Sequence, residues 1–441
     1  MLNIGLAVEI ITPPFGAGLI GYINFRPASG VLDDLKVHAM VMEKNGRKTG
    51  FLVFDVLHLG EYMFTGIRMA LRAAGIDFAD DVIISATHTH TGPQSRNPNN
   101  MRDPENYACQ GMIDAAVRAM TRAARSMAPA ELFYAEKDEN PCAFVRRYLM
   151  KNGKVVTNPT RCNPDIVGPE TEFDRHVRVL AVKQYGRISA LMVNIANHCD
   201  TVGGTMVSAD WPGRMEAEIR YALKEDVPVF ALTDASGNIN HFDVHRKIDQ
   251  TNYDEAVRIG RIYGRIVEDL LDKLEPVDEG EIEVSNTKVV IPNRKVTDAE
   301  YAEAKKYLED TKDVPKSGGD LTSEGLANGD VTVCRCFAQM LLDCRDKSLP
   351  SRTCRLTRIN LGKALAFVSL PGEPFNGIAE AIRKVSPYRH TFVIELAQSE
   401  SVYVPMRDCF ARGGYETTAR PNTVAPEASD VLIAAAVANL Q

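Results

Sequence analysis

Two histidines one residue apart follow a run of β-branched residues in the segment Ile83–Pro93, IISATHTHTGP. His88 and His90 stand where a predicted buried strand, residues 81–86, leaves its sheet, and a Gly-Pro turn follows them. Residues i and i+2 of an extended segment point the same way, so one or both imidazoles can face a single metal ion. The segment therefore predicts a metal-binding loop beyond a strand end.

Polar residues also follow three other strand-like runs, MVNIANHCDTVGG, VFALTDASGNINHFD and FVSLPGEPF. Each has a simple structural explanation, because Asn and Asp form turns and a glutamate can cap the next helix. Taken together, His, His and Glu after buried strands provide the ligands of a catalytic zinc site. The polar residues at these three ends are His198 and Asp200, then Asp234, Asn238, Asn240 and His241, and Glu373.

The composition is that of a globular protein, with 441 residues of which 45% are hydrophobic and 25% charged. The net charge of -7, without a Lys/Arg block, argues against nucleic-acid binding. No apolar run approaches the roughly 20 residues of a membrane helix, so we expect no stable membrane insertion. The first residues lack the features of a signal peptide, and the nine cysteines are scattered. We expect a cytoplasmic protein with a small-molecule substrate, and a homo-oligomer is compatible with the sequence.

Strand-like and helical segments alternate through the first 270 residues, which predicts an α/β fold with mixed β-sheets flanked by helices. Asn45-Gly46 and Gly186-Arg187 are typical of hairpin turns. The expected hairpins are 36–43 with 49–57 and 177–185 with 188–196. The other expected strands are 81–86, 227–233, 354–361 and 364–370, and the expected helices are 62–75, 112–127, 212–223, 253–274 and 375–385.

The stretch 276–353 differs in character from the rest of the chain. It contains a strand-like segment at 281–291, a charged helix at 298–313 and a loop-like run at 315–330. We therefore expect a single domain over residues 1–441 with an excursion at about 276–353. The excursion is a candidate for a lid or an oligomer contact.

Several of these segments resemble the catalytic domain of the neutral/alkaline (non-lysosomal) ceramidases, which are zinc-dependent amidases. The resembling blocks keep their order over most of the chain, and THTH-x-GP is the most specific of them. The blocks are GLAVEIITPPFG with Gly21-Tyr22, Thr87–Pro93, Asn197-His198, Gly237–Asn240, Pro371–Glu373 and Gly413–Glu416.

The resemblance implies a ceramidase-like catalytic fold and one Zn²⁺ per chain, or another divalent metal. Carried over from the family, the zinc ligands are His88, His198, Glu373 and Tyr415. The second histidine of THTH and a family arginine that help to hold the substrate correspond to His90 and Arg146. The neighbouring Arg147 makes the alignment of the arginine ambiguous.

The sequence departs from the family at the position of a serine thought to act on the amide carbonyl. That position is Asn240, which cannot supply an alkoxide nucleophile, and Ser236 is four residues away. The chain therefore looks like a divergent member without the serine nucleophile. We also expect no C-terminal immunoglobulin-like domain, because the Tyr415 block lies close to the end of the sequence. These departures argue against ceramide as the substrate.

The sequence predicts a zinc-dependent hydrolase that uses metal-activated water on an amide or ester bond of a small polar substrate. His90 and Arg146 would stabilise the oxyanion, and Asn240 would orient substrate or water. The alternatives are a metal-dependent lyase, a lactonase or an enzyme cleaving a sugar derivative, and a non-catalytic binding descendant. The candidate substrate-binding residues are Asp200, Asp234 and Asn238.

Overall fold

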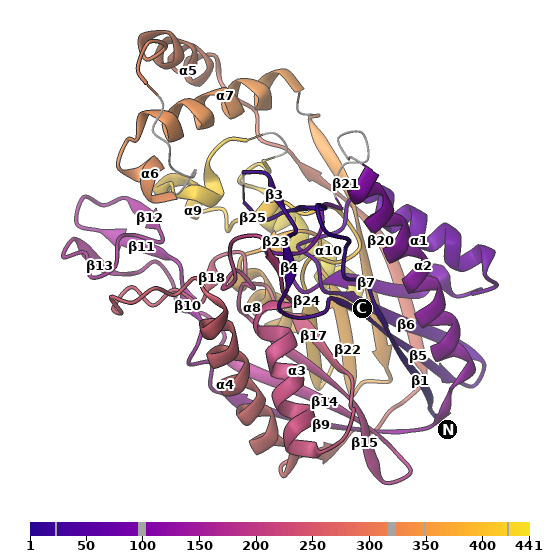
Figure 1. Cartoon of the computed structure of the whole chain (residues 1–441). Helices are drawn as coiled ribbons and strands as arrows, with labels where there is room; N and C mark the ends of the chain where they lie inside the picture. The colour runs from indigo at the N-terminus through magenta and orange to yellow at the C-terminus, as the bar shows by residue number, and fades with distance from the viewer. Residues whose placement is uncertain (23, 96–102, 316–322, 348, 421–422) are drawn as a thin grey trace.

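Three sheets of four or five strands form the centre of the molecule (Figure 1). The computed structural model describes residues 1–22, 24–95, 103–315, 323–347, 349–420 and 423–441. In spatial order, the first sheet consists of β7 (Val82–Ala86), β6 (Arg47–Phe54), β5 (Lys36–Lys44), β1 (Asn3–Ile10) and β8 (Ala128–Pro129). The second consists of β17 (Val229–Thr233), β15 (Arg187–Ile195), β14 (His176–Gln184), β9 (Glu131–Asp138) and β19 (Glu275–Pro276). The third consists of β20 (Ile282–Pro292), β21 (Ser351–Leu361), β22 (Leu365–Ser369) and β24 (His390–Ile394).

The same connection occurs in all three sheets. An antiparallel hairpin is followed by a helix, which leads to a strand that pairs in parallel with the second hairpin strand. Parallel neighbours need such a crossover, usually a helix, because a tight turn makes the next strand run antiparallel to the one before it. The three crossover helices are α1 (Glu61–Ala73), α3 (Asp210–Leu223) and α8 (Asn376–Val385). Each sheet is therefore mixed, and the predicted fold class is confirmed.

The inner faces of the sheets share one hydrophobic core. Phe51, Phe230 and Phe367, one from each sheet, belong to the same buried cluster, and the rings of Phe51 and Phe367 meet edge to face at 4.8 Å. Each outer face is covered by a pair of helices (Figure 1). Burial on both faces explains why the strands are almost continuously apolar in the sequence. The pairs are α1 with α2 (Asp103–Arg125), α3 with α4 (Tyr253–Leu271), and α8 with α10 (Ala428–Leu440).

Strands β20 and β21 pair along their whole length, from Ile282 with Leu361 to Pro292 with Ser351. Both ends of the stretch 276–353 thus run along the third sheet. Between them lie α5 (Asp298–Asp310), α6 (Ser323–Ala327) and α7 (Val331–Lys347), at the top of Figure 1. The loop expected at 315–330 falls partly outside the described residues, and α6 occupies part of the remainder.

Helix α7 was not predicted from the sequence, and α2 begins at Asp103 rather than Met112. The buried residues of α7 are Val333, Phe337 and Cys344, so it has no long apolar stripe of the kind that reveals a helix. Within the described parts of the chain, no helix is long and apolar enough to cross a membrane.

The loops at one end of the sheets contain short strands of two to four residues and one short helix (Figure 1). Three small groups matter for the site: β10 with β18, β11 between β12 and β13, and β23 with β25. Their bounds are β10 (Phe144–Val145), β11 (Arg147–Met150), β12 (Val155–Thr157), β13 (Ile166–Pro169), β18 (Ile239–Asn240), β23 (Glu373–Pro374) and β25 (Tyr403–Val404). The remaining short elements are β2 (Gly18–Leu19), β3 (Arg26–Pro27), β4 (Gly30–Val31), β16 (Met206–Val207), α9 (Cys409–Arg412) and the 3₁₀ turns Ala79–Asp81 and Tyr415–Thr417.

Candidate metal centre

The carboxyl ends of the parallel strands of the three sheets meet at one place. Thr87 follows β7, Thr233 ends β17 and Glu395 follows β24. The Thr233 hydroxyl donates to the Thr87 carbonyl at 3.3 Å, and the Glu395 N–H donates to the Thr233 carbonyl at 3.0 Å. Residues just beyond strand ends of different sheets are therefore brought together, as is usual for functional sites on α/β scaffolds.

His88 and His198 face each other at this junction, with their Nε2 atoms 3.1 Å apart. The Nδ1 of His88 lies 2.8 Å from the Leu57 carbonyl, and the Nδ1 of His198 lies 3.1 Å from the Ser236 carbonyl. A carbonyl oxygen only accepts, so each Nδ1 carries a hydrogen, and the Nε2 atom of each ring is the one that can offer a lone pair to a cation. His88 also has a φ of 78°, a strained conformation of the kind that concentrates at functional sites.

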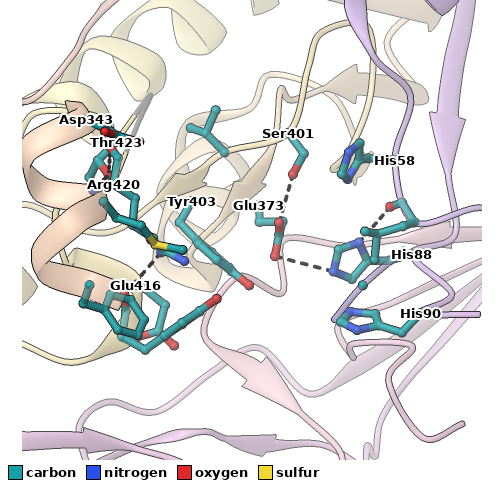
Figure 2. A pocket seen from close by; sticks show the side chains of 16 residues that line it. His58, His88, His90, Asp343, Glu373, Ser401, Tyr403, Glu416, Arg420 and Thr423 are labelled. Carbon is teal, nitrogen blue, oxygen red and sulfur yellow. Dashed lines mark hydrogen bonds and ion pairs between the residues drawn. The ribbon is translucent and has the colours of Figure 1, made fainter. Parts of the chain in front are cut away.

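Glu373 completes the arrangement (Figure 2). Its Oε2 lies 3.5 Å from His88 Nε2 and 3.4 Å from His198 Nε2, and has no hydrogen-bond partner among the described residues. Its Oε1 accepts from the Ser401 hydroxyl at 2.9 Å. Ligand atoms about 2.0–2.1 Å from a tetrahedral zinc ion are about 3.3 Å apart, which matches these three distances. The buried donor set therefore fits a divalent metal ion.

His90 faces the same centre, but its ring makes none of the close contacts that join His88, His198 and Glu373. Its ring centroid lies 5.0 Å from that of His88 and 6.0 Å from that of His198, and the three histidines form a group able to hold a metal ion. Neither of its ring nitrogens has a hydrogen-bond partner in the described structure. A side chain at Gly21 would place its Cβ 2.8 Å from His90, so the glycine backbone holds the ring in place. Burial, followed by the His88 charge, lowers the pKa of His90 well below its usual value, which makes it a neutral imidazole.

The two adjacent arginines have different surroundings. Arg146 donates through Nε to Glu416 Oε1 at 2.8 Å, and its Nη1 lies 3.2 Å from His198 Nε2. Arg147 points away from the histidines and donates to Glu416 Oε2 at 2.7 Å and to Glu170 Oε2 at 2.5 Å. Arg146 lies between β10 and β11 and Arg147 begins β11, and of the two only Arg146 contacts a histidine of the centre.

The tyrosine beside Glu373 is Tyr403, which the sequence reasoning missed. Glu373 and Tyr403 are direct partners in the β23–β25 ladder. The ladder needs glycine at position 372, where φ is 66° and a Cβ would lie 2.2 Å from the Val402 carbonyl oxygen. Figure 2 shows the Tyr403 hydroxyl pointing toward Glu373, and burial followed by the Glu373 charge raises the pKa of Tyr403 well above its usual value.

Tyr415, the predicted ligand, also lines the cavity but makes other contacts. The Arg420 guanidinium lies 4.3 Å from the centre of its ring, and its ring centroid is 6.0 Å from that of Tyr403. The sequence offers no signal for choosing Tyr403, because the choice depends on the register of two two-residue strands. The Gly-Gly-Tyr-Glu block also contributes Glu416, which is fully buried and accepts hydrogen bonds from both arginines.

Asn240 is fully buried, and its side chain is used within the fold. Its Nδ2 donates to Asn158 Oδ1 at 2.9 Å, and its Oδ1 accepts from the Phe242 N–H at 3.2 Å. Ser236 donates to the Glu395 carboxyl group through its hydroxyl and, at 2.9 Å, through its backbone N–H. Neither Asn240 nor Ser236 lines the cavity at the metal centre.

The three predicted substrate-binding residues lie in three different surroundings. Asn238 accepts from the Asn376 N–H at 2.8 Å and so holds the start of α8. Asp234 accepts from Arg383 at 2.5 Å in a buried ion pair away from the cavity. Of the three, Asp200 is the one whose negative charge raises the pKa of both His90 and His198 against the effect of burial.

Asp200 forms a buried ion pair with His241, whose Nδ1 lies 2.8 Å from its Oδ1. The other ring nitrogen of His241 faces the Gln250 carbonyl at 2.7 Å, so both nitrogens donate and the ring is positively charged. Burial would raise the pKa of Asp200, but the charge of His241 lowers it below its usual value. Asp200 is therefore an anion behind the histidines.

A cavity of about 510 Å³ opens in front of the metal centre (Figure 2). His88, His90 and Glu373 form one wall with Tyr403. Helix α7 contributes to the opposite wall. The residues of that side are Phe337, Met340 and Asp343, together with Arg420 and Thr423.

Comparisons with known proteins agree with this architecture. No protein-family model matches the chain. The chain is 23% identical to neutral ceramidase from Pseudomonas aeruginosa over 456 aligned residues, which cover 90% of this chain and 66% of that protein. The crystal structure of neutral ceramidase from Pseudomonas aeruginosa matches with a TM-score of 0.74 at 19% identity, over 99% of this chain and 74% of that one. A structure described as ceramidase complexed with C2 matches with a TM-score of 0.72 at 17% identity, over 100% of this chain and 74% of that one.

These likenesses show that the mixed α/β fold is that of the neutral ceramidases and that the chain is distantly related to their catalytic region. The chain spans about two thirds of the length of the curated relative. The centre formed by His88, His90 and His198 lies within this shared fold and is able to hold a metal ion.

Proposed function

We propose that this protein is a zinc-dependent hydrolase that uses metal-activated water on an amide or ester bond of a small polar substrate. The observation that carries the proposal is the spacing of 3.1–3.5 Å between His88 Nε2, His198 Nε2 and Glu373 Oε2. The Nε2 atom of each ring can offer a lone pair and Glu373 Oε2 has no hydrogen-bond partner among the described residues, so a divalent cation between the three atoms would bind all of them. The similarity to neutral ceramidase supports the hydrolytic reaction class.

The metal ligands that we propose are His88, His198 and Glu373, with Tyr403 as the fourth in place of Tyr415. Their carbonyl and hydroxyl partners orient the two imidazoles and the carboxylate, as outer hydrogen bonds do in zinc proteins. A bound zinc ion supplies a nucleophile at neutral pH, because it lowers the pKa of a bound water to about 7.

His90 and Arg146 provide the polar groups for the reacting bond. His90 is neutral, its ring nitrogens have no partner among the described residues, and it lines the cavity, so it can accept or donate a proton at the substrate. With a metal held by His198, the Nη1 group of Arg146 would be free to donate to a developing oxyanion. Glu416 fixes the guanidinium of Arg146 in this position. Asn240 acts through the fold, since its side chain is bound to Asn158.

The far wall of the cavity supports a polar substrate. Arg420, Asp343 and Thr423 offer charged and hydroxyl groups within a cavity of about 510 Å³, while Phe337 and Met340 provide a limited apolar surface. This lining suits a small molecule with polar substituents next to the scissile bond. A wholly apolar cavity would have favoured a lipid amide instead.

The proposal is tested with a panel of small amides and esters, using wild type, wild type treated with EDTA, and His88→Ala. We expect hydrolysis by wild type, loss of activity by at least about a hundredfold in His88→Ala, and recovery of the EDTA-treated protein by zinc. His245→Ala is the matched control, because His245 is exposed and away from the cavity. Undiminished hydrolysis by His88→Ala would overturn the proposal. Hydrolysis of lactones alone, or cleavage of a sugar-derived substrate without the addition of water, would favour the alternative reactions.

A further inference from the structure

A second cavity, of about 720 Å³, lies between helix α1 and strand β21. It has no lining residue in common with the cavity at the metal centre. Its charged lining is mainly basic, with five basic side chains and three acidic ones. These are Arg68, Arg72, Lys288, Arg352 and Arg355, with Glu61, Asp80 and Glu400.

Arg68 is buried in the wall of this cavity, with 7% of its surface exposed. Its guanidinium donates to the Gln398 side-chain carbonyl and, at 3.4 Å, to the Phe64 carbonyl, both of which are neutral. Its Nε has no hydrogen-bond partner among the described residues. A buried cation that contacts only neutral groups is costly, so the site is suited to an added negative charge.

Arg355 lines the same cavity and is also incompletely neutralised. It donates to the Asp80 backbone carbonyl at 2.5 Å, whereas the Asp80 carboxylate lies 3.9 Å from its Nη1. That carboxylate is held by Arg72 through two hydrogen bonds of 2.6 Å each. The Nε of Arg355 has no hydrogen-bond partner within the described chain. Burial, followed by the charge of Arg355, lowers the pKa of Arg68 to about 10.

We propose that this cavity is a binding site for a phosphate-type oxyanion, either free phosphate or the phosphate group of a small monoester, held by Arg68 and Arg355. The planar guanidinium group matches two oxygens of a phosphate and forms charge-assisted hydrogen bonds with them. The volume of about 720 Å³ leaves room for the organic part of a monoester.

The site is connected to the metal centre through one short segment. Gln398 accepts from Arg68, the Ser399 hydroxyl accepts from the Arg355 N–H at 2.9 Å, and Ser401 donates to Glu373. An anion bound at the arginines therefore lies beside the segment that orients a proposed metal ligand. The binding site itself stands independently of any hydrolytic activity.

The test is isothermal titration calorimetry of the full chain with inorganic phosphate and with glycerol 3-phosphate, at constant ionic strength set by chloride. Arg355→Gln removes one of the two guanidinium groups, those of Arg68 and Arg355, that we propose hold the anion. The matched control is Arg265→Gln, on the exposed side of α4, where the side chain is 67% exposed. We expect saturable binding by wild type and by the control, and binding at least about tenfold weaker by Arg355→Gln.

Binding of both ligands supports a site for the phosphate group itself, and binding of glycerol 3-phosphate alone assigns the site to a monoester. Arg68→Met gives a second measurement: its melting temperature in phosphate-free buffer should equal or exceed that of wild type, and phosphate should not raise it. The absence of binding by wild type would overturn the proposal. Equal affinity of Arg355→Gln and wild type would overturn it as well, since the bound anion would then lie elsewhere, for example at the metal centre.

Discussion

Glu395 lies behind the metal centre and gives a prediction that does not depend on the substrate. Its Oε2 accepts from the Ser236 N–H at 2.9 Å, and the Ser236 carbonyl in turn accepts from His198. The side chain is fully buried, and burial raises its pKa from 4.5 to about 8. Glu395 is therefore protonated at neutral pH, although nearly all glutamates are ionised there.

The perturbation is Glu395→Gln, which replaces the protonated carboxyl group with a neutral amide of the same shape. The pKa of Glu395 is higher in the folded state, so its stabilising contribution is complete below pH 4.5 and is lost as the pH rises through about 8. One proton over this window corresponds to at most about 5 kcal/mol, at about 1.4 kcal/mol per pH unit. Glutamine does not titrate, so the variant should gain up to that amount relative to wild type between pH 4.5 and pH 8.

The assay is urea unfolding at a series of pH values, with EDTA present so that both proteins are free of metal. Glu309→Gln is the control, because the Glu309 side chain is 70% exposed. We expect wild type and the control to lose stability together as the pH rises, and Glu395→Gln to lose less. Parallel pH profiles for Glu395→Gln and wild type would refute the reasoning, because Glu395 would then be ionised without cost.

Three further substitutions test separate parts of the site. Tyr403→Phe should weaken zinc binding by at least about tenfold in a competition titration, whereas Tyr415→Phe should not; the reverse result would restore Tyr415 as the ligand. Glu416→Gln leaves a buried arginine pair without its shared charge and should lower the free energy of unfolding by about 3–5 kcal/mol; an unchanged urea midpoint would contradict this. Asn240→Ala should cost about 1–3 kcal/mol of stability through loss of its hydrogen bond to Asn158, with full zinc content; loss of zinc would place Asn240 at the metal.

Local features of the fold could be predicted from the sequence because they depend on neighbouring residues. The turn Asn45-Gly46 joins the first expected hairpin, and Tyr185-Gly186 joins the second, one residue earlier than predicted because Arg187 already pairs with Gln184. Glycines 46 and 186 adopt the positive φ that such turns require. The arrangement of the strands could not be predicted, because it depends on distant partners such as Ile282 and Leu361. The repeated hairpin–helix–strand connection could not be predicted either, because the three segments that form it show no repeat in their amino-acid sequence.

The same distinction holds for the candidate site. A polar residue directly after a buried strand is visible in the sequence, and the strand ends that meet in the structure are those that carry His88, His198 and Glu373. The partner of Glu373 was missed, because the pairing with Tyr403 is decided by a two-residue ladder. Asp234 also follows a buried strand, as the proposed ligands do, but its carboxylate accepts a hydrogen bond from Arg383 of helix α8. Spacing alone does not distinguish such an ion pair from a ligand.

The most direct test of the metal centre is the zinc content of the purified protein, measured by mass spectrometry after removal of metal with EDTA and reloading with zinc. We predict about one equivalent per chain in wild type and in the control His245→Ala. His88→Ala and Glu373→Gln should retain only a small fraction of an equivalent under the same conditions. Less than about half an equivalent in wild type, or equal zinc content in all four proteins, would contradict a metal ion held by His88, His198 and Glu373.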